Sequence, residues 1–509
     1  MKTDRIPSLF RFKTIYYILP FWLAAILCLI GDIKFNDLGY YLKFGEVMIE
    51  KGALVRQDLF TYTFYGLHYL NSGWLSQVSL AFCEKMGGLE GLIMLRAALL
   101  LLAMAILYHL IGNLTKHYKI TLMFIVFVVA LGVANWGIRP QLFIIPIFAV
   151  FYSFLYRKKE LKNPSILLFF LLMILWVNLH SSFSLGIILV GIFLAGEALD
   201  EYFHDIRSYK NQRERLRELA GNTRLKRLLF LLIIVTLATV INPYGIAIWK
   251  DMWANASLSQ GRSTEWSPTA MKDFSGYCFI VSVVLAGAIL KYSKRKITFT
   301  DAFLLLAFLF AGFKAVRMIL WWGLVSSPIL AVHFCSIEFV QERISRQKEG
   351  AAESECLPLN ILFFVVLLVS VLSFLPWVRP YHPMKVMRNF INARTEPVAI
   401  ANYIKKERLQ GNMYNDINWG SYLIWKLWPE YKVFADNRLH LVPEEIWKDI
   451  KDVHYGLGNW EKILDKYGIS FVVLSKKDNK RTIEFIGDSP EWKKAYEDEA
   501  GVIFVRGEK

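Results

Sequence analysis

Long apolar runs alternate with short polar turns along the first three quarters of the chain. Runs of about 17–25 mainly apolar residues are candidates for membrane spans. Eleven such runs occur, at about 14–31, 89–112, 120–136, 140–156, 165–180, 183–199, 227–243, 275–291, 300–316, 317–336 and 358–377. This pattern predicts an α-helical polytopic membrane protein.

The pattern changes at about residue 378 to that of a soluble domain. Helical periodicity marks residues 396–409, 420–427, 443–453 and 460–467, and strand patterns mark 412–417, 432–436, 469–475 and a terminal hairpin of 492–498 and 501–506. Alternation of strands and helices predicts a small α/β domain. We therefore divide the chain into a transmembrane domain, residues 1–377, and a soluble domain, residues 378–509.

Basic residues cluster in five of the connections between spans, at 116–119, 157–162, 207–227, 291–296 and 343–348. Short cytoplasmic loops carry an excess of Lys and Arg, so these loops and the N-terminus are predicted to be cytoplasmic. The loops 32–88, 136–140, 180–183 and 244–274 and the α/β domain are then extracytoplasmic. This topology requires residues 74–85 to form a juxtamembrane helix, which is too short to span a bilayer. Residues 201–227 are predicted to form a cytoplasmic amphipathic helix pair that is no more than a solvated connector.

Composition and charge support this interpretation. A hydrophobic content of 55% is too high for a single soluble core of 509 residues. The net charge of +16 comes largely from the basic loops, so we expect no nucleic-acid partner. The five cysteines show no metal-ligand spacing and predict no disulfide framework. The first apolar run lacks a small-residue cleavage site and is predicted to be a retained signal anchor.

The loop of residues 32–88 is long, aromatic and acidic, and loops of this length are usually functional or disordered. Asp37 is a candidate general base that accepts a proton from an acceptor; the alternative is a cap for a helix over residues 37–50. Asp58 can orient the acceptor, bind a cation or cap a turn. Two acids in one loop can also hold a divalent metal with waters, such as Mg or Mn.

Charged side chains at span ends often mark function in membrane proteins. Arg139 and Arg317, with Lys314 one turn before Arg317, suit a grip on a lipid phosphate; the alternative is anchoring at the interface. His180 is a candidate general acid or base, or a hydrogen-bond donor to the phosphate, although a structural histidine fits the pattern too. Glu265 is a further candidate acid in the loop 244–274.

Several segments together resemble the C-type glycosyltransferase (GT-C) superfamily, whose members use a polyprenyl-phosphate sugar donor. NDLGYYLKFGEVMIEKG matches the opening of the first outer loop and HYLNSGWLSQVSLAFCEKMGG its second half, and Arg96 follows in the next span. RPQ, NLH, NPYG, EWSP, NWGSYLIW and the D-x-R of Asp436 and Arg438, which we expect to pair locally, are similar to segments of bacterial members. The order of these motifs, more than any one of them, carries the resemblance over nearly the whole chain.

The sequence departs from the superfamily pattern in three places. Many members open the loop with two adjacent acids, whereas here Asn36 and Leu38 flank Asp37. LNSGWL stands where some members have a Pro-rich acceptor-side motif. No WWD-type motif occurs in the C-terminal domain, which argues against an oligosaccharyltransferase.

The resemblance implies an inverting glycosyltransferase of the bacterial inner membrane. It would move a sugar from a polyprenyl-phosphate donor to an extracytoplasmic glycan, lipid or protein, with Asp37 as base and Tyr41 and Trp74 on the acceptor side or in the loop. The alternatives are a transporter or flippase of a lipid-linked glycan and a non-catalytic envelope polysaccharide assembly protein. Transporters typically show internal repeats and broken spans, and this sequence shows neither clearly.

Overall fold

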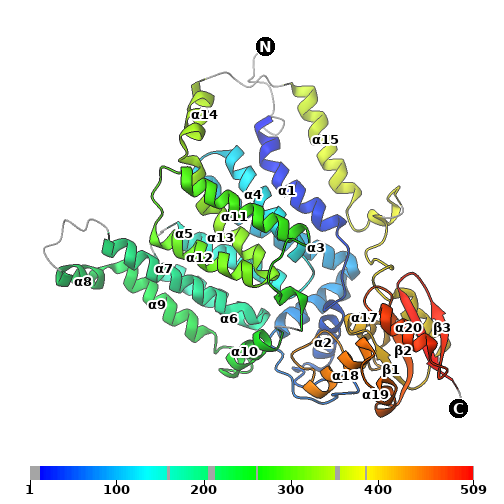
Figure 1. The fold of residues 1–509 in the computed structure, drawn as a ribbon. Helices are drawn as coiled ribbons and strands as arrows, with labels where there is room; N and C mark the ends of the chain where they lie inside the picture. The colour runs from blue at the N-terminus through cyan, green and yellow to red at the C-terminus, as the bar shows by residue number, and fades with distance from the viewer. Residues whose placement is uncertain are drawn as a thin grey trace.

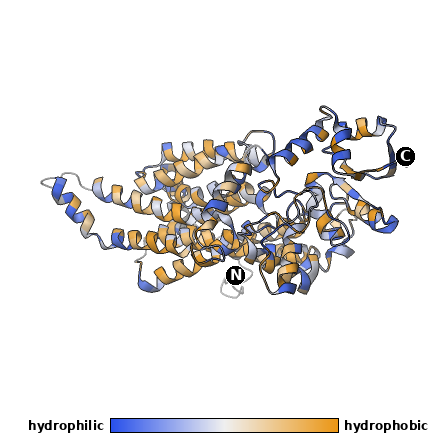
Figure 2. Cartoon of the chain, turned by 90° about the horizontal axis from the view of Figure 1, so that it is seen from below, coloured by the Kyte–Doolittle hydropathy of each residue, from blue (hydrophilic) through white to orange (hydrophobic). Residues whose placement is uncertain are grey.

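Most of the chain is helical, and the helices form one long bundle with a small mixed domain at one end (Figure 1). The computed structural model describes residues 12–157, 161–203, 212–259, 262–349, 356–384 and 387–507. Hydrophobic residues dominate the bundle, and hydrophilic residues are more frequent in the domain near the C-terminus (Figure 2). Hydropathy therefore differs between the bundle and the C-terminal domain.

Each of the eleven apolar runs coincides with a helix. These helices are α1 (Phe12–Ile30), α3 (Trp74–Thr115), α4 (Tyr118–Gly132), α5 (Gln141–Tyr156), α6 (Asn163–Leu179), α7 (Ser184–Phe203), α9 (Thr223–Ala238), α11 (Phe274–Tyr292), α12 (Phe299–Lys314), α13 (Ile319–Cys335) and α15 (Leu357–Ser373). By length and composition, five helical segments of the described chain can cross a membrane: Lys13–Ile30, Trp74–Thr115, Ser181–Phe203, Phe274–Tyr292 and Val316–Cys335. Four shorter apolar helices, α4, α5, α6 and α15, accompany them.

Helix α3 contains both the predicted juxtamembrane helix and the span that follows it. The helical path breaks at Gly88, where φ is 62° and ψ is −157°. Residues with a Cβ rarely adopt this conformation, so glycine permits the kink. The kink separates residues 74–87 from the apolar part of α3, and the two parts take different directions.

Polar contacts join neighbouring elements at one end of the bundle. At the end far from the C-terminal domain, Arg224 of α9 pairs with Glu197 of α7, and Ser293 after α11 lies 2.8 Å from Nδ1 of His333 on α13. The described parts of the basic loops lie at this end, which also carries α8 (Gln212–Gly221) and α14 (Glu338–Glu349) (Figure 1). Part of the predicted amphipathic pair, residues 204–211, lies outside the described residues.

The C-terminal domain is a four-stranded sheet with helices around it. Its elements are α16 (Val398–Glu407), β1 (Asn412–Asn415), α17 (Ile417–Leu427), α18 (Glu444–Tyr455), α19 (Trp460–Lys466), β2 (Ile469–Ser475), α20 (Lys480–Asp488), β3 (Trp492–Glu497) and β4 (Gly501–Arg506). The strand order is β1-β2-β4-β3, with β1 parallel to β2 and the other pairs antiparallel. The predicted α/β character and terminal hairpin are confirmed.

The predicted strand over residues 432–436 is wrong. This segment does not join the sheet; it pairs with the connection between α1 and α3 instead. The amide of Val433 donates to the carbonyl of Phe60 at 3.0 Å, and its carbonyl accepts from the amide of Tyr62 at 3.2 Å. The apolar pattern therefore reports burial against a loop, which periodicity alone cannot distinguish from burial in a sheet.

The hydrophobic core is continuous between the bundle end and the C-terminal domain. One cluster of buried residues contains Phe35, Phe44 and Phe60 of the α1–α3 connection together with Trp419 and Phe471 of the domain. Helix α2 (Leu38–Lys51), within that connection, packs directly on α17. The domain is thus seated on the segment that carries Asp37.

Candidate functional site

Four connections at the domain end of the bundle bring charged residues together. Asp37 precedes α2, Arg139 precedes α5, Glu265 lies in the short helix η5 (Thr264–Trp266), and Arg317 lies in η6 (Val316–Met318). These residues are widely separated along the sequence. All four are candidates on sequence grounds, and the structure places them in one cluster.

Asp37 occupies the N-cap position of α2, but its side chain accepts no capping hydrogen bond from the helix. Its Oδ2 instead lies 3.4 Å from Nε of Arg139, and 20% of the side chain is exposed. Burial raises the pKa of Asp37 above its ordinary value, and the positive charge of Arg139 partly opposes this rise. Asp37 is therefore a half-buried carboxylate with raised basicity rather than a helix cap.

Arg139 lies between two carboxylates. Its Nη1 donates to Oε1 of Glu265 while its Nε faces Asp37. Burial alone would raise the pKa of Glu265, but the adjacent Arg139 and then Arg317 hold it below its ordinary value. Glu265 is consequently ionised, and it fixes the guanidinium that in turn faces Asp37.

Arg317 is the second cation of the cluster, and it has fewer polar contacts than Arg139. Its guanidinium carbon lies 4.7 Å from the ring centroid of Trp266, and its Nη2 donates to Oε1 of Gln141 at 3.4 Å. Within the described part of the chain it forms no ion pair at salt-bridge distance. A cation held over an aromatic ring without a carboxylate partner can bind an anionic ligand.

His180 ends α6 beside this cluster. Its Nδ1 accepts from the amide of Ser182 at 3.0 Å and lies 2.8 Å from the Ser182 hydroxyl oxygen. Burial and then the positive charge of Arg317 lower the pKa of His180 to about 3. The imidazole is therefore neutral at physiological pH, which limits it to hydrogen bonding rather than charge pairing with a phosphate.

Three further candidates, Tyr41, Trp74 and Lys314, differ in burial and in the contacts they make. Tyr41 is half-buried on α2, and burial followed by the negative charge of Asp37 raises its pKa. Trp74 donates from Nε1 to Oδ1 of Asn178 at 2.9 Å, which ties the start of α3 to the end of α6. Lys314 is exposed, and its ammonium lies 5.5 Å from the ring centroid of Phe310.

Asp58 is fully buried in a different set of contacts. Its Oδ2 accepts from the amide and the hydroxyl of Thr61 at 3.0 and 2.7 Å. Its Oδ1 accepts from Nη2 of Arg438 at 2.5 Å. Both carboxylate oxygens therefore have protein donors, so we assign no chemical step to Asp58. Asp436 also pairs with Arg438, as the sequence predicted.

The sequence left open whether two acids hold a divalent metal such as Mg or Mn. Among the described residues, no three His, Cys, Asp or Glu side chains are grouped so that they could hold a metal ion. Asp37 and Glu265, the two acids of the cluster, both face Arg139. The positive charge between these acids therefore comes from a guanidinium.

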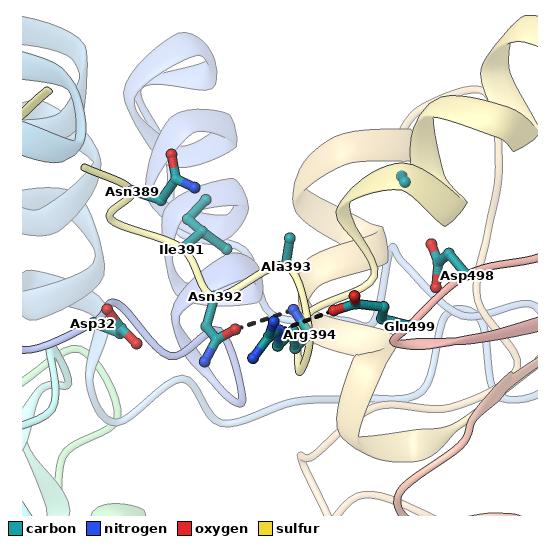
Figure 3. A pocket seen from close by; sticks show the side chains of 9 residues that line it. Asp32, Asn389, Ile391, Asn392, Ala393, Arg394, Asp498 and Glu499 are labelled. Carbon is teal, nitrogen blue, oxygen red and sulfur yellow. Dashed lines mark hydrogen bonds and ion pairs between the residues drawn. The ribbon is translucent and has the colours of Figure 1, made fainter. Parts of the chain in front are cut away.

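A cavity of about 630 Å³ lies apart from the charged cluster, between the segment 389–394 and the turn before β4. Figure 3 shows Asp32, Asn392, Arg394 and Glu499 around it, with Arg394 paired to Glu499. Of the candidate site residues drawn from the sequence, none lines this cavity.

Comparison with known proteins gives no match at the level of sequence families or curated sequences. Among solved structures, the chain is similar to the archaeal oligosaccharyltransferase AglB from Archaeoglobus fulgidus, in complex with an inhibitory peptide and a dolichol-phosphate. The TM-score is 0.56 at 12% identity, over 92% of this chain and 70% of AglB. The chain has the GT-C fold. The resemblance drawn from motif order thus agrees with the fold, although sequence identity is low.

Two structures of ArnT from Cupriavidus metallidurans, one bound to undecaprenyl phosphate and one in the apo state, also match. Both have a TM-score of 0.48, at 11% and 12% identity, over 96% of this chain and 97% of ArnT.

Three residues near Asp37 were not predicted from the sequence, namely Glu396, Ser421 and Asn437. Each contacts the backbone of the segment 35–40, in the connection between α1 and α3. Ser421 lies within the NWGSYLIW motif, and Asn437 is the central residue of the D-x-R motif. No local signal in these motifs indicates that their side chains reach the loop, because that contact depends on how the domain docks.

Proposed function

We propose that this chain is an inverting glycosyltransferase that moves a sugar from a polyprenyl-phosphate donor to an extracytoplasmic acceptor. The observation that carries the proposal is the gathering of Asp37, Arg139, Glu265 and Arg317 at one end of a GT-C bundle. A carboxylate with raised pKa beside a loosely held guanidinium offers both a base and an anion site. These are the two groups that sugar transfer from a lipid phosphate requires.

In the proposed reaction, the acceptor hydroxyl or amine attacks the anomeric carbon of the donor sugar. Its proton passes to Asp37, a bond forms from the acceptor to the sugar, and the bond from the sugar to the phosphate oxygen breaks. The electron pair of that bond leaves with the polyprenyl phosphate. A single displacement of this kind inverts the anomeric configuration and needs no covalent enzyme intermediate.

The two arginines take different parts in this proposal. Arg317 binds the leaving phosphate, because it lies over Trp266 and, among the described residues, no carboxylate lies within salt-bridge distance of it. Stabilisation by a fixed cation grows as negative charge develops on the leaving oxygen. Arg139 is paired with Asp37 and Glu265. It therefore positions Asp37, and its positive charge keeps the Asp37 carboxyl ionised in a fraction of the molecules. His180, neutral and adjacent to Arg317, supplies a hydrogen bond to the donor.

The placement in the cell belongs to the same proposal. The eleven apolar helices would cross a bacterial inner membrane with the basic loops in the cytoplasm. The charged cluster and the C-terminal domain would then be extracytoplasmic, where a glycan, lipid or protein acceptor is reached. The donor would enter from the bilayer between helices, since its polyprenyl chain remains in lipid.

The first test separates donor binding from chemistry. Purified protein in nanodiscs is titrated with undecaprenyl phosphate while its thermal unfolding is followed. We expect wild type and Asp37→Asn to be stabilised equally, and Arg317→Ala to lose most of the shift. Lys314→Ala, which removes a nearby exposed cation, is the matched control and should behave as wild type.

Chemistry is then measured as release of undecaprenyl phosphate from a panel of undecaprenyl-phosphate-linked sugars. Asp37→Asn should lose at least ~10²-fold in rate, a typical contribution of a general base. Full activity of Asp37→Asn would show that the base assignment is wrong. Binding of undecaprenyl phosphate without any release from the panel, together with movement of the lipid across a bilayer, would instead favour a flippase.

A further inference from the structure

The segment that carries Asp37 is held by side chains from a distant part of the chain. The amide of Phe35 donates to Oε1 of Glu396 at 3.1 Å. Asn437 donates from Nδ2 to the carbonyl of Asn36 at 3.0 Å. The amide of Tyr40 donates to the hydroxyl oxygen of Ser421 at 3.2 Å. These bonds bracket Asp37 on both sides.

The packing leaves this segment little room to shift. Ser421 is fully buried, and Glu396 is 5% exposed. A Cβ built on Gly39 would lie 1.9 Å from the carbonyl oxygen of Ser421, so α2 and α17 approach at backbone distance. Glycine at position 39 is therefore required by the contact between the loop helix and the domain helix.

A buried ion cluster fixes the docking next to Asn437. Arg438 pairs with Asp58 of the α1–α3 connection and with Asp436 of the domain, and all three side chains are almost fully buried. The guanidinium carbon of Arg438 lies 5.1 Å from the ring of Phe44 and 5.5 Å from the ring of Tyr40. Breaking a buried pair of this kind leaves an uncompensated charge, so the docked arrangement resists separation.

We propose that the C-terminal domain is a constituent part of the catalytic centre, in which Asn437 acts as a positioning residue for Asp37, with Ser421 and Glu396 in support. This inference rests on the proposed function. It goes further by assigning the domain a role inside the reaction centre, whereas a cover or an acceptor-selecting module would contact only the substrate. The residue at position 37 faces Arg139 because three domain side chains fix the backbone around it.

The positioning is tested first without any substrate. Hydrogen exchange of the peptide covering residues 33–41 is compared in wild type, Asn437→Ala and Asn412→Ala. Asn412 is the matched control, because its Nδ2 also donates to a backbone carbonyl, that of Tyr467 at 2.9 Å, but within the domain. We expect Asn437→Ala to raise exchange about fivefold in this peptide, since one hydrogen bond contributes on the order of 1 kcal/mol. Asn412→Ala should leave that peptide unchanged.

The second measurement is turnover with the undecaprenyl-phosphate-linked sugar that the panel identifies. Asn437→Ala should lower kcat about tenfold while KM for the donor stays within twofold, because donor contacts are untouched. Asn437→Asp should in addition move the acidic limb of the pH–rate profile upward, since a new carboxylate near Asp37 raises the pKa of Asp37. This shift would show that position 437 lies close enough to Asp37 to act on it, and the fall in kcat at constant KM in Asn437→Ala reports the positioning.

The outcomes distinguish the two proposals. Exchange in Asn437→Ala equal to that in Asn412→Ala overturns the positioning inference, whatever the activity. Unchanged kcat in Asn437→Ala beside an inactive Asp37→Asn overturns it as well. Full activity of Asp37→Asn overturns the base assignment itself and is independent of the exchange result.

Discussion

Arg139 shows how one side chain sets the chemistry of its neighbours. It faces Asp37 at 3.4 Å and also pairs with Glu265. Without that positive charge, burial would raise the pKa of Asp37 further, and the pKa of Glu265 would rise from its present lowered value. In the proposed reaction, Arg139 thus leaves the pKa of Asp37 high enough for it to accept a proton and low enough for the carboxylate to be ionised at neutral pH.

Arg139→Gln should therefore change the pH dependence of transfer. Removing the cation raises the pKa of Asp37, so the acidic limb of the pH–rate profile should move to higher pH. We expect the rate at neutral pH to fall by about one order of magnitude, with donor binding largely retained. Arg139→Lys keeps the charge and should leave the limb near its wild-type position. A profile unchanged by Arg139→Gln would contradict the pairing.

Glu396 connects the loop to the domain, and its contribution to the stability of the folded protein depends on pH. Burial raises the pKa of Glu396 to about 7, from 4.5 in the unfolded chain, although the Phe35 amide and Lys34 oppose the shift. Between these two pH values the folded protein binds more protons than the unfolded chain, so stability falls as pH rises through this window. At about 1.4 kcal/mol per pKa unit, the loss is on the order of 3 kcal/mol.

Glu396→Gln should remove this pH dependence and keep the hydrogen bond from Phe35. Glutamine retains an acceptor oxygen but does not ionise. The variant should gain thermal stability relative to wild type as the pH is raised from 5 to 8, and the two should differ least near pH 5. Thermal unfolding in detergent at several pH values measures this difference. A constant difference in Tm across the range would show that Glu396 does not titrate in this window.

At the scale of elements, the kink in α3 decides where the first long connection ends and the apolar helix begins. Residues 74–87 are tied to α6 by the hydrogen bond from Trp74 to Asn178. They also approach α2 closely, because a Cβ on Gly45 would lie 2.2 Å from the carbonyl oxygen of Gln77. The kink lets this part of α3 lie against α2 while the remainder runs into the bundle.

Gly88→Ala is expected to destabilise the protein by about 1–3 kcal/mol, because the backbone at position 88 has a conformation that alanine strains to adopt. Gly87→Ala is the control: it lies in the same helix, with nothing within 4 Å of an added Cβ. It should be neutral or slightly stabilising through higher helix propensity. Thermal unfolding of both variants compares them, and equal Tm values would argue against the kink.

At the scale of the whole molecule, the C-terminal domain holds two connections of the bundle at once. It docks on the α1–α3 connection through Arg438 and Asn437. It also contacts the α9–α11 connection, because Arg262 donates from Nη1 to the carbonyls of Leu439 and Val442 at 2.7 and 3.0 Å. Asp37 belongs to the first of these connections and Glu265 to the second, so the domain contacts both segments that carry acids of the cluster.

Chelation of divalent metals is expected to leave sugar transfer unchanged. The acids of the cluster share Arg139, and the described residues contain no group of ligands suited to a metal. The assay compares release of undecaprenyl phosphate with EDTA, and after adding back Mg or Mn. Loss of activity with EDTA and recovery with either metal would show that Asp37 or Glu265 leaves Arg139 to bind an ion.

The sequence by itself determined the helices, the division into bundle and α/β domain, and the candidate residues Asp37, Arg139, Glu265 and Arg317. Apolar periodicity and charge placement are local properties, and they remain valid whatever the helix packing. The tertiary structure alone decided that Arg139 pairs with Asp37 and Glu265, and that Asp58 is enclosed by Thr61 and Arg438.

The docking of residues 432–438 on the α1–α3 connection was likewise decided only in three dimensions. The contact between Asn36 and Asn437 joins residues 401 positions apart. The local sequence around neither residue predicts this contact, because it arises from packing of the complete fold. The sequence therefore supplied the chemical groups, and the packing determined which of them meet.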